Sequence, residues 1–148
     1  MPDWLESLRN LFDDKQPEIV DEDALARAAA VLLVEIALAD DRIAEVEAAR
    51  IAAALAAHFG GDADGNRQLV EQARELVRDS HSLHRYTHAL RTGLGPEQRA
   101  ALVESLWQVA FADGVLDRHE EHLIRRLADL LGVPHREFIR RKHRAGGG

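Results

Sequence analysis

Two short acidic segments are the part of this chain whose residue types and spacing could do chemistry. Asp40 and Asp113 each follow an alanine at the end of a long apolar run, and a glutamate lies seven residues after each, at Glu47 and Glu120. Carboxylate oxygens are the ligands that hard divalent cations prefer. Each segment predicts a helix with an acidic residue at its end, then a short turn, and then a second helix with an acidic residue in its first turn.

These acidic turns have two interpretations. An aspartate at a helix C-terminus faces the negative end of the helix dipole, which costs about 0.3–1 kcal/mol. In the structural interpretation, each aspartate serves as a turn or cap acceptor for the following helix. In the functional interpretation, the turns bind a divalent cation such as Ca²⁺, Mg²⁺ or Mn²⁺. The acids that could supply the oxygen ligands are Asp40, Asp41, Glu45 and Glu47 in the first turn, and Asp113, Asp117, Glu120 and Glu121 in the second.

Neither turn is an EF-hand loop. That loop ends in a bidentate glutamate at its twelfth position. Counting from Asp40 and from Asp113, the twelfth residues are Ile51 and Ile124. Any ion site in this chain would have a different geometry.

The two segments belong to an internal repeat. A constant offset of 73 residues aligns the copies without a gap, so that Leu33 meets Leu106 and Ile51 meets Ile124. Because duplicated helix pairs must bury the same face, identities on the inner face are expected. The repeat therefore predicts two pseudo-symmetric halves.

The hydrophobic periodicity predicts an all-α fold of about seven helices. We expect one helical domain over residues 21–144, preceded by an N-terminal amphipathic segment and linker at 1–20 and followed by a flexible tail at 145–148. The helices are expected at about 24–39, 44–59, 66–78, 83–92, 97–112 and 117–131, with a short last helix from 134. The last helix is expected to expose its basic residues, which are Arg136, Arg140, Arg141, Lys142 and Arg144.

The first twelve residues carry apolar side chains at helical spacing. They form an amphipathic pattern that could pack on the domain, contact a partner protein or lie on a membrane surface. The apolar members of this pattern are Trp4, Leu5, Leu8, Leu11 and Phe12.

Composition narrows the classes of function. The 148 residues contain no cysteine, which excludes disulfides and thiolate metal sites and favours the cytoplasm. The longest apolar run, 28–39, is too short to span a bilayer.

Residues 1–66 hold fifteen acids and five bases, whereas 67–148 hold eleven acids and fourteen bases. This distribution argues against nucleic acid and suits a cation or a basic partner. Seventeen arginines against two lysines are typical of a GC-rich bacterial genome.

Two groups of histidines have spacings that could bind a metal ion. His81, His84 and His88 share one helix face and are interpreted as a solvated surface rather than a zinc site. His119 and His122 fall one residue short of the spacing of a zinc-protease motif, and could instead contribute to an ion site.

A single charge interrupts the first long apolar run. Glu35 lies there, with Gln108 at the equivalent position of the second copy. Since a buried carboxylate needs a partner, Arg50 or another arginine is expected to pair with Glu35.

The stretch 24–142 resembles the bacterial TerB-like domain, named for tellurite resistance. The resemblance rests on the two apolar helices that end in Ala-Asp, the turns, and the later glutamates, and is closest over 106–126. It implies an all-α fold in two halves, divalent-metal binding, and a cytoplasmic stress-response role within a membrane-associated protein complex. Carried over residue by residue, it implies metal ligands at Asp40, Glu47, Asp113, Asp117 and Glu120. The first turn departs from the family pattern, with Asp41 in place of the usual glycine and Ala44 where the second copy has Asp117.

The sequence therefore predicts a non-enzymatic, cytoplasmic TerB-like domain that binds a divalent cation or a basic partner through its acidic turns. No phosphate-binding loop, dinucleotide fingerprint or nucleophile elbow is present. The alternative is a protein-interaction scaffold with purely structural turns. A third reading is a metal-dependent hydrolase that uses the paired carboxylates.

Overall fold

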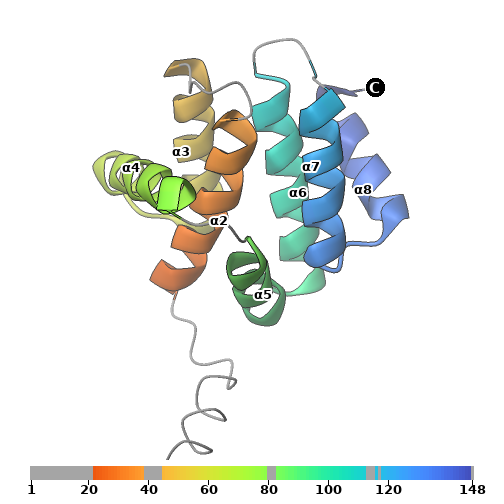
Figure 1. Ribbon diagram of the computed structural model, residues 1–148, viewed down its shortest axis with the longest axis horizontal. Coiled ribbons are helices and arrows are strands. Elements are labelled where there is room, and N and C mark those ends of the chain that lie inside the picture. Colours follow the sequence, from red (N-terminus) through yellow and green to blue (C-terminus); the bar gives the residue numbers. More distant parts are fainter. Residues whose placement is uncertain (1–21, 39–44, 80–82, 113–115, 117, 148) are drawn as a thin grey trace, which may run out of the picture.

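A computed structural model describes residues 22–38, 45–79, 83–112, 116 and 118–147 of the chain. Over these residues the backbone is helical and contains no strand, which confirms the all-α prediction. Seven α-helices are followed by one short π-helical turn, η2, at His143–Gly147 (Figure 1). The helices are α2 (Glu22–Ala37), α3 (Glu45–Phe59), α4 (Ala63–Asp79), α5 (His84–Gly93), α6 (Pro96–Ala110), α7 (Arg118–Leu130) and α8 (His135–Lys142).

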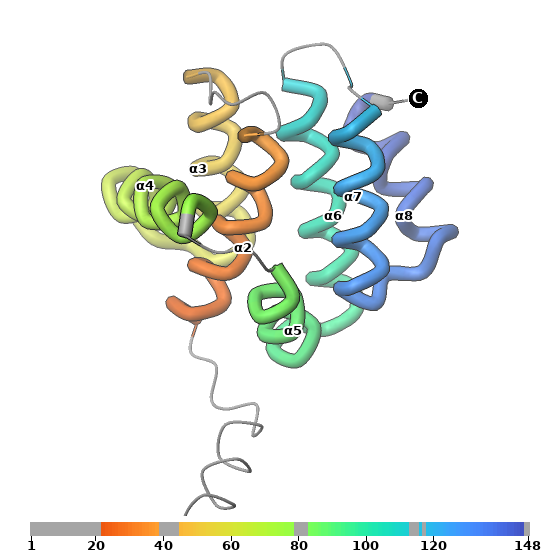
Figure 2. Tube along the Cα trace, viewed as in Figure 1, coloured from red at the N-terminus to blue at the C-terminus, as the bar shows by residue number. Residues whose placement is uncertain are grey.

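Helix α2 lies at the centre of the fold. Eleven of its sixteen residues are buried, as expected for a helix that is apolar on nearly every side. It packs against α3, α4, α5, α6 and α7 (Figure 2). Three consecutive alanines, Ala28 to Ala30, are buried, and their short side chains let neighbouring helices approach α2 closely. None of the described helices is long and apolar enough to cross a bilayer.

Helix boundaries follow local sequence signals. Pro96 opens α6, where its missing N–H is not needed. The Gly95 N–H donates to the Gln98 side-chain oxygen at 2.9 Å. Helix α7 ends at Leu130, and Gly132 in the following turn has a φ of +75°, which is strained for other residues. The Val133 N–H then donates to the Ala128 carbonyl at 2.9 Å, which closes the turn.

Helix α6 carries the second half of the core. Trp107 is its largest fully buried side chain and packs against Phe138 of α8, with ring centroids 5.1 Å apart. Near the start of the same helix, the Arg99 guanidinium donates to the carbonyl of Leu131, the residue that follows α7, at 2.9 Å. Helix α6 is thus tied to both of the helices that follow it.

Two pairs of equivalent positions of the repeat have equal burial. Leu33 and Leu106 are fully buried, and so are Ile51 and Ile124. This agreement is what duplicated helix pairs require. That the two halves superpose as pseudo-symmetric units stays a prediction.

Truncation of a core residue of α2 tests the central position of this helix. Because Leu33 is fully buried, we expect Leu33→Ala to lower the free energy of unfolding by about 2–5 kcal/mol, measured by urea denaturation. The control is Val46→Ala, since Val46 is 49% exposed and its loss should change stability by only about 0.5 kcal/mol. Equal effects of the two changes would contradict the burial of α2.

Candidate functional site

The helices that flank the two acidic turns meet at one end of the bundle. Helices α2 and α6 both finish there, and α3 and α7 both begin there (Figures 1 and 2). Helix α2 packs against both α3 and α6, and α6 packs against both α3 and α7. The repeat therefore places its two sets of helix ends side by side on the same end of the molecule.

Glu47 and Glu120 hold equivalent places at this end. Each is the third residue of its helix, α3 or α7. Both are buried, with exposed fractions of 6% and 3%. A carboxylate in the first turn is stabilised by the positive end of the helix dipole. Each of the two also takes part in at least one further polar or electrostatic interaction.

The other three predicted ligands, Asp40, Asp113 and Asp117, lie outside the described residues. Across the part of the chain that the structure does describe, no three histidine, aspartate or glutamate side chains form a group that could hold a metal. The five-residue ligand set from the sequence thus stays a prediction, of which the structure places two members.

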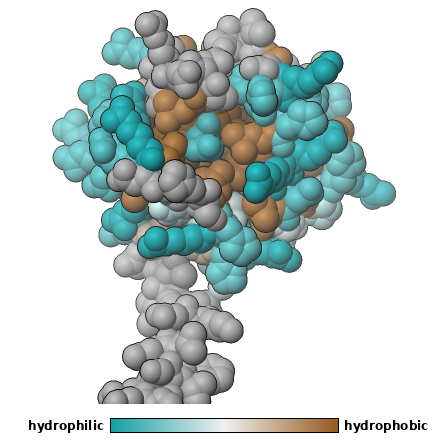
Figure 3. Space-filling model, in the orientation of Figure 1, coloured by the Kyte–Doolittle hydropathy of each residue, from teal (hydrophilic) through white to brown (hydrophobic). Residues whose placement is uncertain are grey.

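A groove lies beside this end of the bundle, on the face seen in Figure 3. Its volume is about 730 Å³, and apolar surface is visible in the hollow at the centre of that face. The groove is formed where α2, α4 and α7 come together, and its lining residues are Glu35, Leu38, Val77, Arg78, His119, His122, Leu123 and Arg126.

Glu35 is the acid of this groove. The expected pair with Arg50 does not form. Arg50 is exposed on α3, and no hydrogen bond or ion pair joins Glu35 to any described residue. Burial raises the pKa of the Glu35 carboxyl above its ordinary value. His119 and His122, weighed from sequence as ion ligands, line the same groove as Glu35.

The remaining predicted histidine group is only partly described. His81 lies outside the described residues. His84 and His88 are exposed, and their rings stack with centroids 6.4 Å apart. This arrangement agrees with a solvated helix face.

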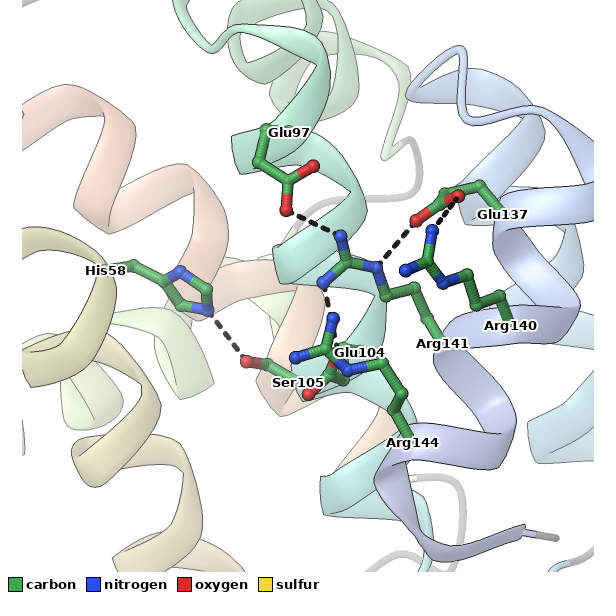
Figure 4. A network of polar contacts seen from close by, with 8 residues as sticks. All are labelled: His58, Glu97, Glu104, Ser105, Glu137, Arg140, Arg141 and Arg144. Atoms are coloured by element: carbon green, nitrogen blue, oxygen red, sulfur yellow. Dashed lines mark hydrogen bonds and ion pairs between the residues drawn. The ribbon is translucent and has the colours of Figure 1, made fainter.

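Arg141 is the centre of a buried ion-pair network (Figure 4). The sequence prediction that Arg141 is exposed was wrong, since only 4% of this residue is accessible. Its three guanidinium nitrogens reach carboxylates of Glu137 at 2.9 Å, Glu104 at 3.1 Å and Glu97 at 2.7 Å. Hydrogen bonding to Arg141 lowers the pKa of the Glu97 carboxyl, and the same three acids raise the pKa of Arg141.

A second polar contact joins α3 to α6. His58 Nε2 lies 2.7 Å from Ser105 Oγ (Figure 4). Burial lowers the pKa of the His58 imidazole, and the nearby Glu104 charge opposes that shift. A histidine beside a serine is also found in hydrolases, but Ser105 is only 6% exposed. Its hydroxyl is therefore closed to a substrate, and the contact is a bond between helices.

Sequence reasoning missed both networks, although signals for them exist. Glu97 and Glu104 are seven residues apart and therefore share a helix face. Glu137 lies four residues before Arg141, the spacing of a helical ion pair. The repeat offset of 73 residues also aligns His58 with Leu131. A polar residue in the first copy thus stands at a position where the second copy has a buried apolar side chain.

The helices and their buried acidic positions define an all-helical domain with two related helix pairs. Comparison with protein-family models finds a match to the family described as tellurite resistance protein TerB, over residues 26–143. Because this match covers most of the chain, the protein belongs to the TerB family. Searches of curated proteins and of solved structures found no match.

Removal of Arg141 tests the ion-pair network. We expect Arg141→Ala to lower the free energy of unfolding by about 1–3 kcal/mol, because it removes three short ion pairs of a buried guanidinium and leaves Glu104 and Glu137 only their longer contacts with Arg144 and Arg140. The matched control is Arg140→Ala on the same helix, since Arg140 is exposed and makes one pair at 3.8 Å; its loss should cost less than about 1 kcal/mol. A loss no larger for Arg141→Ala than for Arg140→Ala in chemical denaturation would contradict the network.

The His58 imidazole should make stability depend on pH. Its pKa in the folded protein is lowered, so below about pH 6.5 the unfolded chain binds the proton first. The free energy of unfolding should therefore fall as the pH falls through this window, by at most about 1.4 kcal/mol per pH unit from this group. Above the window the contribution of His58 is constant.

The measurement is urea denaturation of the wild type and of His58→Gln between pH 7.5 and 5. Gln keeps a polar side chain near Ser105 and does not titrate. The wild type should lose more stability than His58→Gln on acidification. If the free energy of unfolding fell equally with pH in the two proteins, the pKa of His58 would be the same in the folded and unfolded states, which would contradict the prediction.

Proposed function

We propose that this TerB-family domain is a non-enzymatic, cytoplasmic module that binds a divalent cation through its acidic turns. The observation that carries the proposal is the placement of both repeat copies at one end of the bundle. Four helix ends meet there, and the equivalent glutamates Glu47 and Glu120 are buried beside them.

The chemistry of that end favours a hard cation. Carboxylate oxygens are the ligands that hard divalent cations prefer. A site that combines Glu120 with Asp113 and Asp117 would offer oxygen ligands alone, which suits Ca²⁺, Mg²⁺ or Mn²⁺ better than zinc. Asp40 and Glu47 would form the equivalent set of the first copy.

A regulatory role accords with this placement. The family description names tellurite resistance, and we propose that ion binding at the turns adjusts how this end of the bundle meets a protein partner in a stress response. An ion shared by helix ends from both repeat copies would couple the two helix pairs to each other.

Calorimetric titration with calcium, magnesium and manganese tests the proposal. We expect a saturable heat for at least one ion, and a weakening of at least tenfold in Asp113→Asn. Bound ion should also raise the melting temperature, because an ion at about one hundred times its dissociation constant adds about 2.7 kcal/mol to stability.

The matched control is Asp64→Asn, which removes an exposed acid from the first turn of α4. This variant should bind the ion as the wild type does. Two outcomes would overturn the proposal: no saturable heat from the wild type at millimolar ion, or an equal loss of affinity in Asp64→Asn. Either result would favour a scaffold whose acidic turns are structural.

A further inference from the structure

The groove between α2, α4 and α7 combines an apolar floor with a basic rim. Leu38, Val77 and Leu123 contribute apolar side chains, and Arg78 and Arg126 contribute positive charge. Both arginines are exposed and remain outside the ion-pair network around Arg141. Arg78 makes one long, exposed pair with Glu75 of its own helix, at 4.0 Å. A hollow of about 730 Å³ is large enough for several apolar side chains of a docked segment. Its occupant should therefore be amphipathic and acidic.

Residues 1–12 of the same chain have this character. Their apolar side chains, from Trp4 to Phe12, fall within an arc of roughly 120° when plotted at 100° per residue. Residues 1–12 contain two acids, Asp3 and Glu6, and one base, Arg9, and Asp13 and Asp14 follow directly. Residues 1–14 thus hold four acids and one base, a balance opposite in sign to that of the groove rim. Membrane-surface helices usually carry a basic polar face, so this charge also argues against a bilayer as the preferred contact.

The connection to α2 is long enough for the segment to reach the groove. Glu35 lies thirteen residues after Glu22, which along a helix is about 20 Å. The nine residues from 13 to 21 can span about 30 Å when extended. The segment can therefore reach the groove of its own molecule.

We propose that the groove between α2, α4 and α7 is the docking site for the amphipathic Trp4–Phe12 segment of the same chain. Its apolar face would cover the groove floor. Glu6 and the acids directly beside the segment, Asp3, Asp13 and Asp14, would lie near Arg78 and Arg126. The segment also brings two donors, the Trp4 indole N–H and the Arg9 guanidinium, to a groove in which the Glu35 carboxylate makes no hydrogen bond to a described residue.

Cysteine cross-linking in the full chain tests this docking, because the chain has no cysteine of its own. Ser7→Cys is combined either with His122→Cys in the groove or with Gln72→Cys as control. Gln72 lies near the start of α2, since it lines a surface hollow together with Glu22 and Asp23. A segment without a preferred site would therefore react with position 72 at least as fast as with position 122.

We expect a short bis-maleimide to form the intramolecular link to His122→Cys at least tenfold faster than the link to Gln72→Cys. Adding Leu8→Asp to the segment should reduce the groove rate to the control rate. Arg126→Cys repeats the measurement at a second groove position, in case His122→Cys disturbs docking. Products are identified by gel mobility and mass spectrometry, and circular dichroism confirms that each variant is folded.

Three results would overturn the proposal. The first is a groove rate no greater than the control rate at both groove positions. The second is a groove rate that Leu8→Asp leaves unchanged. The third is a link formed only between two copies of the chain, which would assign the groove to the segment of a second molecule. None of these results depends on whether the acidic turns bind an ion.

Discussion

The burial of α2 on nearly every side is the constraint on which the rest of the structure depends. A helix with no solvent-facing stripe gains its apolar stabilisation only when other elements surround it. Five helices do so here, and their positions around α2 then decide which side chains meet. The groove is a consequence of this arrangement, because α4 and α7 do not close over the last turn of α2, where Glu35 and Leu38 line it.

The C-terminal helix is held by a different interaction. A guanidinium with three carboxylate partners satisfies its donors in a fixed geometry, which a lysine could not do. Beside it, the Lys142 ammonium lies 5.2 Å from the ring centre of Trp107, and Phe138 packs on the same ring. Apolar and ionic contacts thus converge on one short helix. Such a helix would be marginal in isolation.

The sequence predicted the helices well because periodicity and turn residues are local signals. The repeat also located the inner faces correctly, as the burial of Leu33, Leu106, Ile51 and Ile124 shows. The sequence prediction was wrong at Arg141. A basic residue on a short helix is expected to be exposed, and its burial depends on the position of α6, which local signals do not give. The groove could not be predicted either, because nothing local brings Glu35 of α2 beside His119 and His122 of α7. Of the predicted metal ligands, only Glu47 and Glu120 could be placed.

Helix α6 contacts its neighbours through polar bonds in three directions. Ser105 meets His58 of α3, Arg99 reaches the end of α7, and Glu97 and Glu104 hold α8. We therefore expect the C-terminal part of the chain to open as a unit rather than one residue at a time. Local opening of α8 requires Arg141 to leave all its carboxylates at once and uncovers Trp107 in the same event. In terms of native-state motion, α6 and α8 form one cooperative unit, and their amide protons should exchange together rather than from the chain end inward.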